Sequence, residues 1–170
     1  GLQNLEMTPE SLKLLFLRGM SKSPWHCLKK AFDELDEETF LWRPPKHTGF
    51  PWMNGSIQDI LFHVTGDKIV QLSQAFGDGS QTWDNLEISK GSLLEMWADL
   101  EKAQLDVIRA VESQTEESLT AKVKIWGGSS LGCEDFFLML AEHDFYHAGQ
   151  VRYIRNIAPD RQVKYGPEAE

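Results

Sequence analysis

The chain has 170 residues, the length of one domain with a substantial core. Apolar residues make up 41% and charged residues 25%, which excludes an intrinsically disordered chain. Acidic residues number 26 against 17 lysines and arginines, for a formal net charge of −9. We therefore expect neither nucleic acid nor an anionic membrane surface as a partner, because binding phosphates requires a basic footprint.

Cysteine usage and the start of the chain indicate a cytoplasmic protein. Cys27 and Cys133 are the two cysteines, too few for a disulfide-stabilised secreted domain and without zinc-knuckle spacing. The first residues show no basic segment followed by an apolar run, and no stretch approaches the roughly 18 apolar residues of a membrane span. We expect a cytoplasmic chain that does not span a membrane.

The first third of the chain predicts two short helices and a long connection. The segment 8–10 (Thr-Pro-Glu) is a helix-start signal, and its helix is expected to end near Gly19. The pair 23–24 (Ser-Pro) repeats the signal, so a second helix, or the first one resumed after a break, is expected there. The segment 36–55 holds three prolines and two glycines, which exclude regular helix.

Longer helices are predicted further along. The tetrapeptides 56–59 (Ser-Ile-Gln-Asp) and 92–95 (Ser-Leu-Leu-Glu) read as capping boxes. The first opens a helix of about 20 residues, which glycines near residue 77 end, and the second opens a long amphipathic helix that ends near Ser113.

The last part of the chain completes the fold prediction. A short strand or extended segment is expected near 121–126, and the strongest helical pattern runs from Cys133 to Ile157 before Pro159. Four long helices without βαβ alternation predict an all-α four-helix bundle with long connections. We expect a single domain over 1–170, with its core at about 8–157 and a tail at 158–170.

Two histidines lie on the predicted inner face of the last helix. Steps of four and three residues give a buried seam that consists of Phe136, Leu140, His143, His147, Gln150 and Ile154. Residues four apart in a helix are roughly 40° apart around its axis and about 6 Å apart along it, so two imidazoles can reach one metal ion. His63 lies on a comparable seam of the helix that starts at 56 and is the candidate third ligand.

Three neutral imidazoles and a water make a metal site with an open coordination position, as in catalytic zinc. The alternative is that these side chains are hydrogen-bonded core histidines, and this alternative is stronger for His63 alone than for the adjacent pair. His26 and His47 are expected at the surface.

Several motifs together resemble the DinB/YfiT-like superfamily of metal-binding four-helix bundles. They are Trp42-Arg43-Pro44, His63 within Ile-Leu-Phe-His-Val, Trp126-Gly127, and His143-x-x-x-His147-x-x-Gln150. The resemblance covers about residues 8–157 and implies a divalent metal, often zinc or nickel, on His63, His143 and His147. It also implies activities such as thiol-dependent transfer or isomerisation, in which the metal activates a low-molecular-weight thiol. Many members have no assigned reaction.

Other metal sites fit the residues less well. The segment 143–147 approximates the zinc-protease motif His-Glu-x-x-His, but its aspartate is one methylene shorter than the general-base glutamate and no third ligand follows nearby. A di-iron site needs two Glu-x-x-His elements and two further acids, which the sequence does not supply. No residue pattern favours haem.

Other side chains near the histidines are candidates for supporting roles. Asp67 could accept the hydrogen bond that sets an imidazole tautomer, or be a solvated acid. Gln150 could orient water or substrate, or pair with backbone. Tyr146 is expected to pack off the ligand face, and Cys133 to be a structural thiol rather than a thiolate at the helix N-terminus.

The tryptophans in the segments between the predicted helices also allow two interpretations. Trp42, Trp52 and Trp126 could plug the ends of the bundle or wall a pocket above the metal.

The functional hypothesis is a metal-dependent enzyme that activates a thiol or water against a small electrophilic substrate, as a thiol transferase or hydrolase. The alternative is a non-catalytic metal-binding or stress-related ligand-binding bundle. A homodimer is also expected, because the apolar residues of 12–17 and 25–32 exceed the single stripe that a bundle helix buries, and family members often pair. The connection 36–55 could cover that surplus instead.

Overall fold

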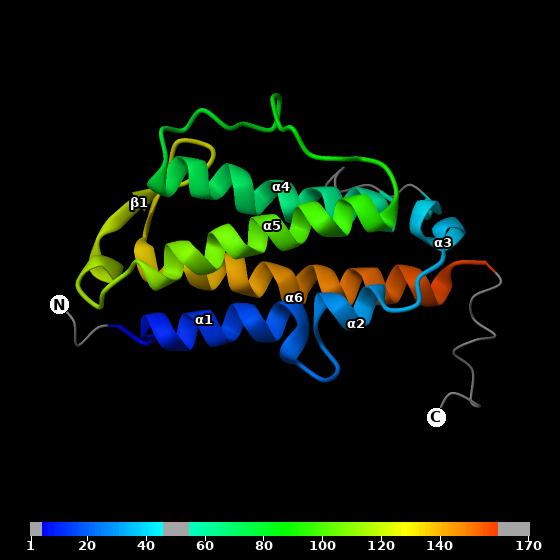
Figure 1. Ribbon diagram of the computed structural model, residues 1–170, viewed down its shortest axis with the longest axis horizontal. Helices are drawn as coiled ribbons and strands as arrows, with labels where there is room; N and C mark the ends of the chain where they lie inside the picture. Colours follow the sequence, from blue (N-terminus) through cyan, green and yellow to red (C-terminus); the bar gives the residue numbers. More distant parts are fainter. Residues whose placement is uncertain (1–4, 46–54, 160–170) are drawn as a thin grey trace.

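The computed structural model describes residues 5–45 and 55–159, and it is mainly helical with a small two-stranded sheet (Figure 1). The helices are α1 (Pro9–Leu17), α2 (Leu28–Phe32), α3 (Glu37–Leu41), α4 (Ile57–Phe76), α5 (Leu93–Glu112) and α6 (Cys133–Ile157). The strands β1 (Lys122–Lys124) and β2 (Ser130–Gly132) pair antiparallel. Within these ranges, no helix is both long and apolar enough to cross a membrane.

The predicted capping residues start their helices. At α4, Ser56 Oγ accepts a hydrogen bond from the Asp59 backbone N–H at 3.1 Å, and the Asp59 carboxylate accepts one from the Ser56 N–H at 2.9 Å. At α5, Ser92 Oγ accepts from the Glu95 N–H at 3.2 Å. Each bond satisfies an N–H group that the helix leaves unpaired, so the bounds expected for these helices are confirmed.

The second predicted helix begins later than its start signal. A π-helical turn (Arg18–Lys22) follows α1, and α2 begins only at Leu28. The prediction of a helix from residue 23 is wrong, because Ser23 Oγ accepts a hydrogen bond from the His26 N–H at 3.1 Å and closes a local turn instead. Trp25 is consequently 77% exposed.

The connection 36–55 is also more ordered at its start than the prolines indicate. Asp36 Oδ1 accepts a hydrogen bond from the Thr39 N–H at 2.7 Å and starts α3, so the exclusion of helix is wrong for residues 37–41. The reason is that the first proline of the connection is Pro44, beyond this turn. Trp42 packs against the core, whereas His47 and Trp52 lie outside the described residues.

The expected extended segment is β1, and its partner β2 carried no separate signal. Lys122 pairs with Gly132 and Lys124 with Ser130. The turn between the strands includes Gly127 and Gly128 at φ values of +97° and +86°, a region that side chains with a Cβ rarely adopt. The hairpin therefore depends on these two glycines.

The long helices run alongside one another, with α4 against α5 and α6, and α1 against α5 and α6 (Figure 1). Their core has two hydrophobic clusters. One joins the N-terminal half of α4 to the C-terminal half of α6 through residues such as Leu61 and Val151. The other, around Phe16 and Phe137, lies at the opposite end of α6. The middle of α6, residues 143–147, lies between the two clusters.

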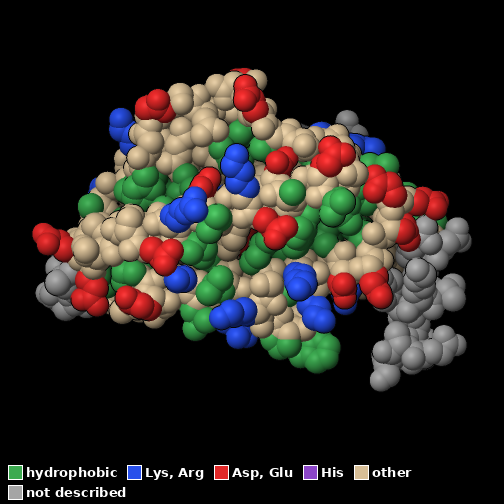
Figure 2. All heavy atoms as spheres, viewed as in Figure 1, with side chains coloured by type: hydrophobic (Ala, Val, Ile, Leu, Met, Phe, Trp, Pro, Cys, Tyr) green, Lys and Arg blue, Asp and Glu red, His purple; other side chains and the backbone are tan. Residues whose placement is uncertain are grey.

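Much of the apolar surplus of the first helices is buried within the chain. Leu12, Phe16, Leu28 and Phe32 are buried, whereas Leu14 is 50% exposed. On the face drawn in Figure 2, hydrophobic side chains reach the surface between interspersed acidic and basic ones. Pairing of two chains stays a prediction.

A buried ion pair joins α4 to α6. Lys68 Nζ donates to Asp144 Oδ2 at 2.8 Å, and the two side chains are 1% and 0% exposed. Lys68 Nζ also lies 5.6 Å from the centre of the Phe16 ring. Burial raises the pKa of Asp144, and the Lys68 ammonium opposes that shift. Sequence analysis gave neither residue a structural role.

We predict that Lys68→Met lowers the free energy of unfolding by about 3–5 kcal/mol, because it leaves a buried carboxyl group without its cation. The double variant Lys68→Met Asp144→Leu is expected to lose less than the sum of the two single variants, since neither charge is then left alone. Urea unfolding followed by circular dichroism measures both. A loss below about 1 kcal/mol for Lys68→Met would contradict the assigned role.

Candidate metal centre

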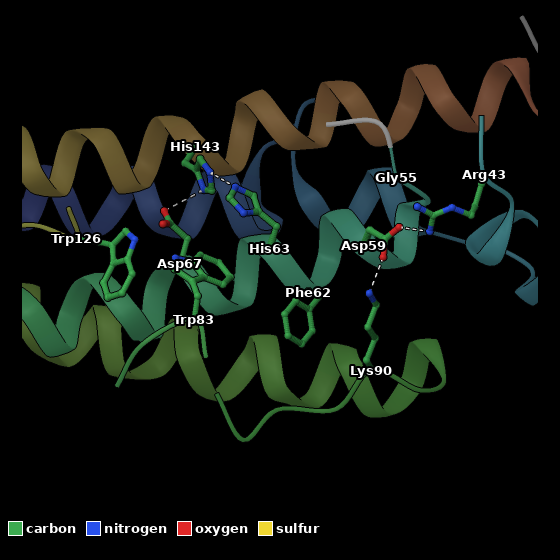
Figure 3. A pocket seen from close by; sticks show the side chains of 10 residues that line it. All are labelled: Arg43, Gly55, Asp59, Phe62, His63, Asp67, Trp83, Lys90, Trp126 and His143. Atoms are coloured by element: carbon green, nitrogen blue, oxygen red, sulfur yellow. Dashed lines mark hydrogen bonds and ion pairs between the residues drawn. The ribbon is translucent and has the colours of Figure 1, made fainter. Parts of the chain in front are cut away.

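Three imidazoles converge between α4 and α6. His63 comes from α4, and His143 and His147 come from successive turns of α6. His143 Nε2 lies 3.1 Å from His63 Nε2 and 2.9 Å from His147 Nε2. The candidate ligand atoms of all three lie within 4.8 Å of one another. Figure 3 shows the rings of His63 and His143 turned toward each other.

The other ring nitrogen of each α6 histidine faces a polar partner. His147 Nδ1 lies 2.6 Å from Gln150 Oε1, a carbonyl oxygen that can only accept, so this contact favours the tautomer with the proton on Nδ1. His143 Nδ1 lies 3.6 Å from Asp67 Oδ2. These contacts favour the tautomer in which the Nε2 lone pairs point into the cluster, and they place both candidate supporting residues, Asp67 and Gln150, beside the histidines.

The donor set fits a divalent ion. Bonds of about 2.0–2.1 Å from imidazole nitrogen to zinc place neighbouring ligand atoms roughly 2.8–3.4 Å apart, from octahedral to tetrahedral coordination. The two short Nε2–Nε2 distances, 3.1 and 2.9 Å, lie within that range. Two facing lone pairs at such distances repel unless a proton or a cation lies between them. Three side chains make up the cluster in the part of the chain that the structure describes.

The electrostatic environment keeps these imidazoles neutral. Burial lowers the pKa of His143 and of His147 to about 3, because repulsion between imidazoles that are protonated together adds to the effect of burial, and for His143 the Lys68 ammonium adds as well. Burial also lowers the pKa of His63, against the attraction of the Asp67 carboxylate. Neutral imidazole is the form that binds metal, and the lowered pKa values favour this form of the three histidines in the folded protein at neutral pH.

A pocket of about 910 Å³ opens beside the histidines (Figure 3). His63, His143 and Asp67 line it, together with Trp83 and Trp126. The position of Trp126 at this pocket agrees with the pocket-wall interpretation of that tryptophan. Its backbone N–H donates to Gln71 Oε1 at 3.0 Å, which ties the β-hairpin to α4.

Trp83 is a site residue that sequence analysis missed. Its ring stacks on His63, with centroids 5.5 Å apart and planes at 10°. A Cβ on Gly66 would lie 2.6 Å from the Trp83 ring, so the glycine in α4 is what lets this loop tryptophan approach. A glycine inside a helical pattern was the available signal, because such glycines often mark close packing.

The remaining candidates are not members of the histidine cluster. Cys133 is buried, and burial raises the pKa of its thiol to about 11, so it is not the thiolate that a helix N-terminus can produce. Tyr146 is 53% exposed, and its ring lies edge-on to the ring of His147 with centroids 5.0 Å apart, so it packs beside the cluster rather than joining it. His26 is exposed, as expected.

No protein-family model matches this chain, and a search of curated proteins finds no match either. The resemblance to the DinB/YfiT-like superfamily therefore stays a prediction that depends on the residues described above.

We predict that the metal-free protein loses stability as the pH falls from 6.5 to 5. In this window the unfolded chain binds protons at His143 and His147, whose ordinary pKa is about 6.5, while the folded chain does not. The free energy of unfolding should fall by about 1–2 kcal/mol per histidine, measured by urea unfolding with a chelator present.

The control for this prediction is the variant His143→Leu His147→Leu. Asp67 and Asp144 have raised pKa values and act in the opposite direction in both proteins, so the pH dependence that the double variant loses is attributed to the two histidines and their effect on Asp67. Equal pH dependence in both proteins would contradict the prediction.

Proposed function

We propose that this protein is a DinB-like four-helix bundle that binds one divalent metal ion through His63, His143 and His147. The observation that supports this most directly is the convergence of the three Nε2 atoms. The bundle would consist of α4, α5, α6 and the interrupted pair α1 and α2, of which α1 packs on α5 and α6, and α2 on α6.

We further propose that the protein is a metal-dependent enzyme of the thiol-transferase or hydrolase type, with zinc or nickel as the ion. Such an ion supplies Lewis acidity and lowers the pKa of a bound thiol or water. The chain's own residues would hold the ion and orient its ligands. Gln150 would set the tautomer of His147, and Asp67 faces His143. Trp83 and Trp126 would wall the space for a small electrophilic substrate.

The alternative is a non-catalytic metal-binding or ligand-binding bundle. A fourth protein ligand beside the histidines would favour it, since closed sites are structural. Among the described residues the cluster has three members, and two of them also line the 910 Å³ pocket. This combination of a three-ligand cluster and an adjoining pocket favours the enzyme.

The metal site is tested by elemental analysis. We expect about one divalent ion per chain in the unaltered protein and a loss of most of it in His143→Ala His147→Ala, because one imidazole alone binds weakly. His26→Ala, at an exposed histidine outside the cluster, is the matched control and should keep its metal. Unchanged metal content in the double variant would show that the site is assigned to the wrong residues.

The chemistry is tested by the metal-dependent reaction of a small thiol, 2-mercaptoethanol, with a chromogenic aryl halide. Zinc- or nickel-loaded protein is expected to accelerate the reaction, with a rate that falls at low pH as the bound thiol becomes protonated. Removing the ion with a chelator should abolish the acceleration, and adding it back should restore it. Acceleration that survives chelation would contradict the metal-dependent mechanism.

A further inference from the structure

The pocket beside the histidines also reaches a second group of charged residues. Arg43, Asp59 and Lys90 line the same cavity as His63 and His143. Figure 3 shows them on the side of the pocket away from Trp126. Arg43 Nη1 lies 2.5 Å from Asp59 Oδ2, and Lys90 Nζ lies 2.7 Å from Asp59 Oδ1.

Asp59 holds the two cations in place. Its carboxylate is anchored by the Ser56 N–H in the capping box of α4, so it cannot swing away from the helix. Burial raises the pKa of Asp59, but hydrogen bonds from Lys90 and Ser56 and the charges of Lys90 and Arg43 outweigh it and bring the pKa to about 2. A permanently charged anchor therefore joins two chain segments at the pocket.

Arg43 and Lys90 keep hydrogen-bond donors that Asp59 does not occupy. Two positive charges face one carboxylate, for a local net charge of +1. An arginine has five N–H donors and a lysine three, and one donor of each contacts Asp59. The side chains remain 66% and 51% exposed. Lys90 Nζ also lies 5.5 Å from the centre of the Phe62 ring, which further restricts it.

An aromatic stretch separates the two polar ends of the pocket. Phe62 lies on its wall between His63 and Lys90, and Trp83 lies beside His63 (Figure 3). Apolar walls with a few placed polar groups are typical of small-molecule sites. Cations already held in position lose little side-chain entropy when a ligand binds, which favours recognition by them.

We propose that the small molecule taken by this pocket carries a carboxylate, which Arg43 and Lys90 bind, while its apolar body lies along Phe62 and Trp83. The inference rests on the proposed small-molecule function and adds the substrate class. The local net charge of +1 complements a carboxylate, which is a monoanion. The chain as a whole carries a net charge of −9, so the attraction for an anion would have to come from this local group.

The test compares 4-phenylbutanoate with its neutral analogue 4-phenylbutanamide by isothermal titration calorimetry. The protein is kept metal-free with a chelator, so that no ion can attract the carboxylate. We expect the carboxylate to bind about tenfold more tightly than the amide, the difference that charge-assisted hydrogen bonds typically supply. Arg43→Gln Lys90→Gln should remove this preference while leaving Asp59 and its cap unchanged.

The matched control is Lys13→Gln Arg109→Gln. These residues are also ion-paired, with Glu112 and Asp106, and are 40% and 68% exposed, but they do not line the pocket. The control should keep the tenfold preference, and circular dichroism should show all proteins folded. Equal affinities, no measurable binding of the carboxylate, or a preference that survives in Arg43→Gln Lys90→Gln would overturn the proposal. Metal content is measured without the organic probes, so failure of the metal site is distinguishable from failure of this subsite.

Discussion

The buried contact between Lys68 and Asp144 is the constraint on which the arrangement of the site depends. It lies at mid-length of α6, between the two hydrophobic clusters, and it is the place where α4 and α6 are joined by charge. Hydrophobic contacts tolerate small shifts of one helix along another, whereas a buried charge pair has one low-energy register. We infer that this pair fixes the register that places His63 opposite His143 and His147.

Burial of polar side chains between α4 and α6 has two consequences. It makes unpaired charge costly, so the carboxylate of Asp144 requires Lys68. It also lowers the pKa of the histidines, so they remain neutral and keep free lone pairs. A divalent ion of the kind proposed would relieve the close approach of those lone pairs. Burial thus links the stability of the fold to the chemistry proposed for it.

Residues of the connections complete the pocket that α4 and α6 line. Trp83 reaches His63 across Gly66, the hairpin reaches α4 through Gln71, and Arg43 and Lys90 meet on Asp59. Each of these contacts joins a residue of a connection to a residue of α4. Helix α4 therefore lines the pocket itself, and it also positions the loop residues that form the other walls.

The sequence by itself determined the long helices and the inner face of α6, because capping and periodicity are local: a serine hydroxyl bonds an N–H three residues away, and positions 143 and 147 share a face in any helix. The prediction from sequence was wrong at residues 23–27 and 37–41, where a hydrogen bond from backbone to side chain decided the local structure. The seam positions made His63 the expected third ligand, but only the tertiary structure decided that α4 and α6 pack in the register that brings it to His143, that Lys68 pairs with Asp144, and which loop residues line the pocket. Those contacts join segments far apart in the chain, and no local pattern records which partner a side chain will find once the helices have packed.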